Sequence, residues 1–194
     1  MTNYSQLRDH ISKRITLTDD DFDLFMSFIQ LKVFPRKHFL LHQGAPSNEI
    51  FYVINGCLRA FHTDADGNDK AVMFASNDWW ITDISGFTNE SKAIVSIDAL
   101  EETEVYALSR YNFDKLLDEM PIFERFFRQL FQHAYMREQK RSIQNLSLSA
   151  ASRYDFFLRS YPHLQSKIAG KHIASYIGVT PEFLSVLRSR KANS

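Results

Sequence analysis

Residues 50–61, IFYVINGCLRAF, consist of two short apolar runs joined by Asn55–Gly56. Asn-Gly is a strong signal for a two-residue hairpin turn, because both residues tolerate the positive φ angles that such a turn requires. Short runs of Ile, Val, Phe and Tyr bounded by turn residues are typical of strands. This segment therefore predicts a β-hairpin.

Similar strands are predicted on both sides of this hairpin. Further turn residues occur at Gln43–Pro46 and at Asp64–Asn68. The remaining apolar runs that predict strands are Lys32–Pro35, Phe39–Leu41, Ala71–Phe74, Ala93–Ile97 and Glu104–Leu108. Roughly seven or eight short strands, with no helix expected between them, indicate an antiparallel barrel, roll or sandwich.

One helix is predicted before the strands. Thr18, followed by three aspartates, is typical of a helix N-cap. Phe22, Phe25, Phe28 and Ile29 then recur at helical spacing, which predicts an amphipathic helix.

A longer amphipathic helix is predicted over residues 121–145. Its apolar stripe consists of Ile122, Phe126, Leu130 and Ala134, with Phe123, Phe127 and Phe131 beside it. An apolar face this wide must be buried. We expect one side to pack on the strands and the other on a second copy of the chain, which would make this a dimerisation helix; packing within one chain alone is the alternative.

The composition is that of a folded protein without membrane segments. The 194-residue chain is 44% hydrophobic and contains 17 Phe and 8 Tyr, which supplies a core and excludes a disordered chain. It has no run of about 18 apolar residues, and residues 1–14 do not resemble a signal peptide, so a cytoplasmic location is expected. Cys57 is the only cysteine, which excludes an internal disulfide.

The 23 basic and 23 acidic residues are divided unevenly along the chain. Residues 137–194 contain ten Lys and Arg against three Asp and Glu, or +7, and residues 1–136 contain thirteen against twenty, or −7. A basic C-terminal part favours a polyanionic partner through phosphate contacts, with ordinary scatter of solvated charge as the alternative.

Residues 169–188 have the features of a helix-turn-helix. Gly178 supplies a tight turn, and Thr180–Pro181 is typical of an N-cap followed by proline at the first position of a second helix. The residues expected to face inward from the two helices are Ile173, Ala174, Ile177, Phe183, Leu184 and Leu187.

The opposite face of the second helix is predicted to enter a major groove of DNA. Glu182 is suited to accept from a cytosine amino group, Val186 to contact a thymine methyl, and Ser185 to bond several base edges. A helical hairpin used only for packing is the alternative. The predicted DNA-binding residues are Lys171, Thr180, Glu182, Ser185, Val186, Arg188, Ser189 and Arg190.

Three parts of the chain carry a resemblance that spans nearly its whole length: Lys37–Gly44 with Ile50–Arg59, Glu104–Ser109, and Ile173–Ser185. They resemble the opening strands, the closing strand and the recognition module of the Crp/Fnr family of transcription regulators.

The resemblance implies an α+β fold with an N-terminal antiparallel β-roll, which is a double-stranded β-helix of the cyclic nucleotide-binding kind. A long dimerisation helix and a C-terminal all-α helix-turn-helix domain follow. The expected domains are residues 1–120, 121–145 and 146–194. The expected partners are double-stranded DNA, a second copy of the chain and RNA polymerase.

The site of the ligand phosphate departs from the family pattern. Cyclic-nucleotide binders of the family use a Gly-Glu pair for the ribose and, about ten positions later, an arginine–serine pair for the phosphate. A gapless register places Thr82–Asp83 and Ala93–Ile94 there. Without an arginine at Ala93 a buried phosphate lacks its bidentate partner, and Lys92 offers only a point charge. Cyclic AMP is therefore not expected to bind.

An aromatic-lined effector pocket is a further hypothesis for the roll, with plain core packing as its alternative. The effector stays open between another small molecule, a protein contact and none, and no cofactor is predicted. The residues assigned to this pocket are Trp79, Trp80, Asp83, Phe87, Lys92 and Ala93.

Two further departures concern the C-terminal helices. Few residues follow Arg188, so the downstream wing strands of the family are not expected. Pro181 and Val186 stand where many members place arginines, so no operator sequence follows from the resemblance.

A second class of function remains as an alternative. It is a β-roll small-molecule-binding or cupin-like protein whose C-terminal helices serve assembly only. The roll contains no His-x-His pair, so no metal site is predicted. No catalytic motif occurs, so an enzyme is not expected.

Overall fold

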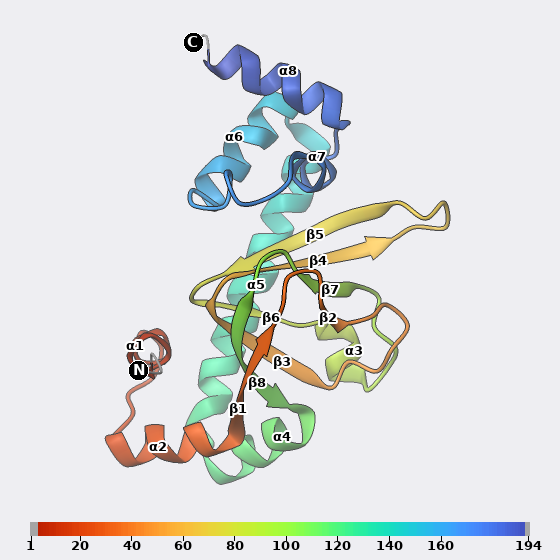
Figure 1. Ribbon diagram of the computed structural model, residues 1–194. Coiled ribbons are helices and arrows are strands. Elements are labelled where there is room, and N and C mark those ends of the chain that lie inside the picture. The colour runs from red at the N-terminus through yellow and green to blue at the C-terminus, as the bar shows by residue number, and fades with distance from the viewer. Residues whose placement is uncertain (1–3, 193–194) are drawn as a thin grey trace.

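The computed structural model describes residues 4–192 as a roll of two β-sheets, with helices at both ends of the chain (Figure 1). The outer ends of the first and last predicted domains, residues 1–3 and 193–194, lie outside the described residues. Two helices precede the strands: α1 at Tyr4–Ser12 and α2 at Asp19–Phe28. The predicted cap of α2 is confirmed, because the Thr18 side chain accepts from the Asp21 amide at 3.1 Å.

The roll consists of two four-stranded antiparallel sheets, with strand orders β1-β8-β3-β6 and β2-β7-β4-β5. The strands are β1 Ile29–Phe34, β2 Phe39–Leu41, β3 Glu49–Asn55, β4 Cys57–Thr63, β5 Asp69–Ser76, β6 Trp79–Ile81, β7 Ser96–Ala99 and β8 Thr103–Ser109. Inward-facing residues of both sheets form an apolar core that includes Val53, Leu58, Ile97 and Val105. Antiparallel strands on short turns are what the sequence predicted, but the predicted hairpin over residues 50–61 is wrong. β3 pairs with β6 and β8 and β4 pairs with β5 and β7, so the Asn55–Gly56 turn carries the chain from one sheet to the other.

The β3–β4 turn depends on glycine at position 56. Gly56 has a φ of +105°, and a Cβ atom there would lie 2.5 Å from the Thr103 hydroxyl oxygen. Thr103 uses this hydroxyl to accept from the Cys57 amide at 3.1 Å, so the two turns pack directly on each other. Glycine is required here both for its backbone conformation and for its lack of a side chain.

The prediction that no helix interrupts the strands is wrong. The short helix α3, Ile84–Asn89, lies between β6 and β7. It is capped by the Asp83 side chain, which accepts from the Gly86 amide at 2.9 Å. Such a short helix has too few turns to show an apolar period in the sequence. The strand predicted at Ala93–Ile97 begins later, at Ser96, and the Ala93 amide donates instead to the Ala45 carbonyl at 2.8 Å.

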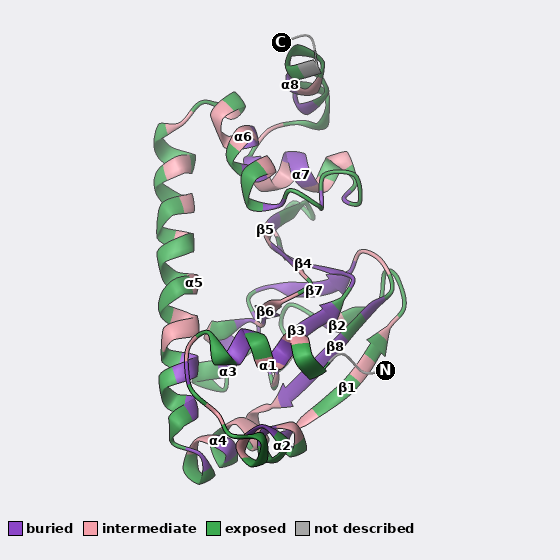
Figure 2. Ribbon diagram, turned by 90° about the vertical axis from the view of Figure 1, so that its left-hand side faces the viewer, coloured by how far each residue is buried: buried purple, intermediate pink, exposed green. Residues whose placement is uncertain are grey.

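Helix α5, Ile122–Ser147, follows α4, Arg110–Glu119, and runs along the roll. Only its first turns are buried, through Phe123, Phe126 and Phe127, and most of the rest is exposed along its length (Figure 2). Ile122, predicted to lie on the buried stripe, is 40% exposed, because the three phenylalanines define a face that points away from it.

Helices α6 Ala150–Ser160, α7 Gly170–Ile177 and α8 Pro181–Ala192 form the C-terminal part. They share a core with the roll, since Phe74 of β5 lies edge to face with Phe157 and Tyr161 at centroid distances of 6.1 and 5.8 Å. The C-terminal helices are thus packed on the outer face of the β4–β5 hairpin (Figure 1).

Candidate functional sites

Helices α7 and α8 are joined by a tight turn whose geometry is determined by two residues. Gly178 ends α7 in the left-handed conformation, with φ of 69°, and the Val179 amide bonds to the Ala174 carbonyl at 2.9 Å. The Thr180 hydroxyl then accepts from the Phe183 amide at 3.2 Å, which begins α8. These local bonds are the C-cap and N-cap that the sequence predicted.

One face of α8 is buried and the other is exposed. Leu184 and Leu187 are buried with Ile173, Ala174 and Ile177 of α7. The predicted contact residues lie on the outer face or beside it: Lys171, Thr180, Glu182, Ser185, Val186, Ser189 and Arg190 are exposed. The exposed face is continuous, because residues three and four apart lie on the same side of a helix.

Two hydroxyl groups on this face bond to carbonyl groups of their own helix. The Ser185 hydroxyl donates to the Pro181 carbonyl at 3.1 Å, and the Ser189 hydroxyl donates to the Ser185 carbonyl at 3.1 Å. Hydrogen bonds from the Glu182 backbone and the Thr180 side chain hold the pKa of the Glu182 carboxyl below its usual range. Glu182 is therefore charged at neutral pH and able to accept hydrogen bonds.

Two residues of α8 differ from their predicted positions. Phe183, expected to face inward, is 44% exposed. Successive residues are about 100° apart around a helix, so Phe183 lies to one side of the line through Leu184 and Leu187 that meets α7. Arg188 is half-buried, and its Nη1 lies 3.5 Å from where a Cβ atom would stand on Gly170. The Arg188 side chain therefore lies close to α7, whereas the sequence predicted it at the edge of the exposed face of α8.

Helix α7 is attached to the roll by polar contacts that the sequence did not reveal. The Ser175 hydroxyl accepts from the Ala71 amide at 2.9 Å and donates to the Asp69 carbonyl at 2.7 Å. It thereby extends the hydrogen bonding of the β5 edge to the helix. Arg141 of α5 donates to the Ala71 and Val72 carbonyls at 3.0 and 2.6 Å, so three elements meet at this edge.

A buried arginine of β4 is the centre of a second connection. Arg59 makes a two-bond ion pair with Asp98, at 2.9 and 2.8 Å, and its Nη1 also donates to Nδ1 of His172 at 2.8 Å. Burial, and then the charge of Arg59, lower the pKa of His172 to about 4. A lone arginine in the apolar run Leu58–Phe61 is the signal that would have indicated this site.

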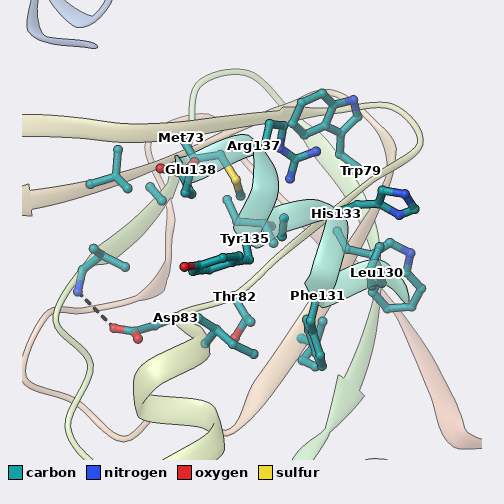
Figure 3. Close-up of a pocket in the computed structure, with 18 of the residues that line it drawn as sticks. Met73, Trp79, Thr82, Asp83, Leu130, Phe131, His133, Tyr135, Arg137 and Glu138 are labelled. Carbon is teal, nitrogen blue, oxygen red and sulfur yellow. Dashed lines mark hydrogen bonds between the residues drawn. The ribbon is translucent and has the colours of Figure 1, made fainter. Parts of the chain in front are cut away.

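The roll and α5 enclose a cavity of about 780 Å³ (Figure 3). Its walls come from β5, β6, the start of α3, the end of α1 with the residues after it, and the segment 130–138 of α5. Three of the residues predicted for an effector pocket line it: Trp79, Trp80 and Asp83. The sequence did not indicate the contributions of α1 and α5, because neither segment is near the strands in the chain.

The other three residues predicted for this pocket do not line the cavity. Phe87 is buried in the core and lies edge to face with Phe113 at a centroid distance of 5.4 Å. Ala93 is buried and its amide donates to the Ala45 carbonyl at 2.8 Å, whereas Lys92 is exposed.

The Asp83 carboxylate is completely enclosed by backbone donors. It is 3% exposed and accepts from the amides of Gly86 at 2.9 Å, Val95 at 3.1 Å and Ile94. Figure 3 shows this carboxylate pointing at the backbone across the loop. Backbone amides that converge in this way stabilise an anion, and here that anion is the Asp83 side chain and not a bound ligand.

Asp78 connects α1 to β3 through two side-chain contacts. Its carboxylate contacts Nδ1 of His10 at 2.7 Å and accepts from the Tyr52 hydroxyl at 2.8 Å. Burial by itself would raise the pKa of Asp78, but the bonds from His10 and Tyr52 outweigh it and lower the pKa to about 2. The same contact raises the pKa of Tyr52 above its usual range, after the larger effect of burial.

Comparison with known proteins assigns this architecture. Residues 31–120 match the cyclic nucleotide-binding domain family. The chain is 24% identical over 106 residues to the cyclic AMP receptor protein of Thermus thermophilus, a match that covers 55% of this chain and 49% of that protein. These matches support the resemblance of the chain to regulators of the Crp/Fnr family.

Solved structures share the fold over more of the chain. FixK2 from Bradyrhizobium japonicum superposes with a TM-score of 0.76 at 14% identity, over 85% of both chains. The c-di-GMP-responsive global regulator CLP of Xanthomonas campestris gives a TM-score of 0.72 at 12% identity, over 91% of this chain and 93% of that one. In sequence, however, the match spans only about half the length of the curated Crp/Fnr relatives.

Two features are absent from residues 4–192: a helix that could span a membrane and a cluster of metal-binding side chains. No helix in that range is long and apolar enough to span a membrane. The described His, Cys, Asp and Glu residues form no group of three or more that is suited to a metal ion. Cys57 is buried, and burial raises the pKa of its thiol to about 12, so it remains a protonated core residue at neutral pH.

Proposed function

We propose that this chain is a homodimeric, DNA-binding transcription regulator of the Crp/Fnr type. The observation that carries the proposal is the two-sided character of α8. Leu184 and Leu187 hold it on α7, while Glu182, Ser185 and Val186 face outward. In a helix-turn-helix, the second helix must be fixed on one side and free to meet base edges on the other.

The charge distribution supports the same proposal. Residues 137–194 have a net formal charge of +7, and the exposed Lys171 and Arg190 lie in the two helices of the pair. Cations in such positions displace the counterions condensed on DNA, which makes binding tighter at low salt. The outward side chains of α8 then supply contacts to base edges.

A dimer is supported by the exposed half of α5. Met136, Ile143 and Leu146 are 45%, 58% and 89% exposed, although all three are apolar. Met136 and Ile143 are seven residues apart, and Leu146 follows three residues later, which is the spacing of a coiled-coil seam. We propose that this seam pairs with its copy, so that two α8 helices reach palindromic half-sites about 34 Å apart. RNA polymerase is the further partner that such a regulator would require.

Cyclic AMP is not proposed as the effector, although relatives of this chain are named for it. The amides of Ile94 and Val95 bind the Asp83 carboxylate. Ala93 lies at the register position of the arginine that would hold a phosphate. A cyclic phosphate at this place would meet a buried carboxylate with no guanidinium to offset the repulsion.

The cavity favours a second candidate function, that of a β-roll small-molecule-binding protein whose C-terminal helices serve assembly only. The two candidates differ in what α8 must do. If α8 serves assembly only, the chain does not bind DNA, and charge changes on the outer face of α8 leave small-molecule binding unchanged.

The experiment that tests the proposal is fluorescence anisotropy with the DNA upstream of the chain's own coding sequence. We expect binding that weakens as salt rises, and a loss of about tenfold or more in Ser185→Asp, which places an anion against the groove. Ser91→Asp, with the same charge change at an exposed position on the roll, is the matched control.

A second pair of variants separates phosphate contacts from base contacts. Lys171→Ala with Arg190→Ala should reduce both affinity and the slope of affinity against salt, whereas Arg36→Ala with Lys92→Ala on the roll should change neither. The proposal would be refuted by an affinity for DNA that does not change with salt, or by equal losses of affinity in the two double variants.

A further inference from the structure

We propose that α8 recognises its operator chiefly through the methyl groups of thymine, and that Phe183 and Val186 are the side chains that contact them. This inference rests on the proposed function and deepens it, because it names the base that the regulator selects. Its test varies only the methyl groups of the DNA, so DNA binding and thymine recognition can fail separately.

Two apolar side chains lie next to each other on the surface of α8. Phe183 and Val186 are 44% and 43% exposed. They are three residues apart, so their side chains are neighbours on the helix and form one apolar strip. The sequence suggested a methyl contact for Val186 alone, because it placed Phe183 inward. An apolar group of the partner that covered this strip would remove both side chains from water, which favours binding.

The exposed residues at positions 181–189 of α8 include no side chain that is suited to two-bond recognition of a purine. Arg and Lys bond guanine in this way, and Asn and Gln bond adenine. None of these four residue types occurs among the exposed residues of this range, which are Pro181, Glu182, Phe183, Ser185, Val186 and Ser189. Recognition of the operator by this face must therefore use other contacts.

The two arginines of α8 are not placed for base recognition. Arg188 is half-buried, and its Nη1 lies 3.5 Å from where a Cβ atom would stand on Gly170 of α7. Arg190 lies in the last turn of α8. A recognition helix meets base edges with its N-terminal residues, so Arg190 is better placed to contact a phosphate group.

The polar side chains of the face provide little selectivity between bases. The hydroxyl groups of Ser185 and Ser189 donate to carbonyl groups of α8, which leaves them only acceptor lone pairs for a base. Glu182 accepts hydrogen bonds and is suited to the amino group of cytosine. Thymine is the base that presents an apolar group, its 5-methyl, in the major groove. The selectivity of α8 therefore depends on one carboxylate and on the apolar strip.

The charges around the strip favour DNA as the partner that covers it. Residues 137–194 have a net formal charge of +7, and the exposed Lys171 and Arg190 belong to the same pair of helices as the strip. An apolar strip within a basic surface suits a partner that presents methyl groups between two rows of phosphates. The major groove of DNA that contains thymine has this chemistry.

The test compares two versions of one DNA fragment. The region upstream of the chain's own coding sequence is amplified with thymidine triphosphate or with deoxyuridine triphosphate, so the second fragment lacks the thymine methyl groups and keeps the same base pairing. In fluorescence anisotropy we expect the uracil fragment to bind about tenfold more weakly, since each half-site loses buried apolar surface.

Two results of this comparison would overturn the proposal. Equal affinities for the two fragments, with binding that still weakens as salt rises, would overturn thymine recognition and leave the proposed function intact. No binding to either fragment would overturn both.

Variants assign the methyl contacts to the strip. Phe183→Ala with Val186→Ala should bind the thymine fragment about fivefold more weakly and the uracil fragment as the unaltered chain does. Leu24→Ala with Val33→Ala, at apolar residues that are 43% and 55% exposed elsewhere, should keep the full difference between the fragments. All four residues are exposed, so neither variant is expected to unfold. An undiminished difference in Phe183→Ala with Val186→Ala would overturn the proposal.

A conservative variant separates an apolar contact from a change in the shape of α8. Phe183→Leu with Val186→Ile keeps the apolar surface, so it should retain about half or more of the difference between the two fragments. A loss of the difference as complete as in the alanine variant would show that apolar surface at these positions is not sufficient, and would contradict the proposal.

Discussion

Nη1 of Arg59 donates a hydrogen bond to Nδ1 of His172 across 2.8 Å, and this contact joins the β-roll to the first helix of the C-terminal pair. The two residues are 113 positions apart in the chain. Asp98 holds Arg59 in place through two further bonds. The position of α7, and through it that of α8, is therefore coupled to the inner strands of the roll.

The first prediction concerns the pH dependence of this junction. Burial, followed by the charges of Arg59 and Lys171, lowers the pKa of His172 to about 4, against an opposing effect of Asp98 and Asp69. The folded state thus favours neutral His172, while the unfolded chain takes up the proton near pH 6.5. This stabilisation is complete above pH 6.5 and is lost as pH falls toward 4.

Urea unfolding at pH 7.5 and at pH 5 measures the effect. His172→Asn keeps an oxygen that accepts from Arg59 and removes the titrating group, so it should lose less stability between the two pH values than the unaltered chain. His163→Asn, at an exposed histidine, should lose as much as the unaltered chain. An identical pH dependence in all three proteins would rule out this role for His172.

The second prediction concerns the hydrogen bonds between α7 and β5. Ser175→Ala removes the acceptor of the Ala71 amide, and we expect a loss of about 1 kcal/mol in the free energy of unfolding. Hydrogen exchange of the Ala71 amide should become faster at the same time. Ser189→Ala, which removes a hydroxyl bonded only within α8, should change neither quantity. Unaltered protection at Ala71 would mean that Ser175 does not hold this edge.

The third prediction concerns the enclosed carboxylate. Asp83→Asn replaces an anion that accepts from three amides with a neutral group that has one acceptor oxygen, so a loss of about 1–3 kcal/mol in the free energy of unfolding is expected. Chemical denaturation measures it. Asp66→Asn, at an exposed hairpin tip, should lie within about 0.5 kcal/mol of the unaltered chain. If Asp83→Asn and Asp66→Asn had equal free energies of unfolding, the three amides would not require a charged acceptor.

The fourth prediction concerns the seam on α5. Ile143→Asp with Leu146→Asp places four carboxylates at a seam where two copies pair, because each copy contributes two. Analytical ultracentrifugation should show a dimer for the unaltered chain and a monomer for this variant. Leu24→Asp with Val33→Asp, at apolar residues that are 43% and 55% exposed elsewhere, should remain dimeric. A monomeric unaltered chain would contradict the assignment of this face.

Local chemistry in the sequence determined several elements of the fold. Asn55–Gly56 predicted the turn between β3 and β4, although these strands lie in different sheets and form no hairpin, and Thr18 with the following aspartates predicted the start of α2. Gly178 and Thr180 predicted the turn between α7 and α8. Each of these signals depends on a few neighbouring residues, whose backbone conformation is limited by their own side chains. The exposed face of α8 followed from the same helical period.

Helices α1 and α3 show where this reasoning fails. In α1 only Leu7, His10 and Ile11 are buried, and α3 is shorter than two turns, so each offers few apolar positions from which to recognise a helix. Helix α1 is held by a distant group, through the contact of His10 with Asp78, whereas α3 begins at a local cap, Asp83, that stands before too short an apolar run to be recognised.

The sequence by itself therefore determined most of the strands, helices α2, α5 and α8, the turn between α7 and α8, and the family resemblance. Only the tertiary structure decided which residues of those elements meet: Arg59 with His172, Ser175 with Ala71, and Tyr135 of α5 with Trp80 of β6 around one cavity. The physical reason is the range of the interactions. Turns and caps depend on residues within four positions, whereas a cavity or an ion pair depends on how whole elements pack, and many sequences satisfy the same packing.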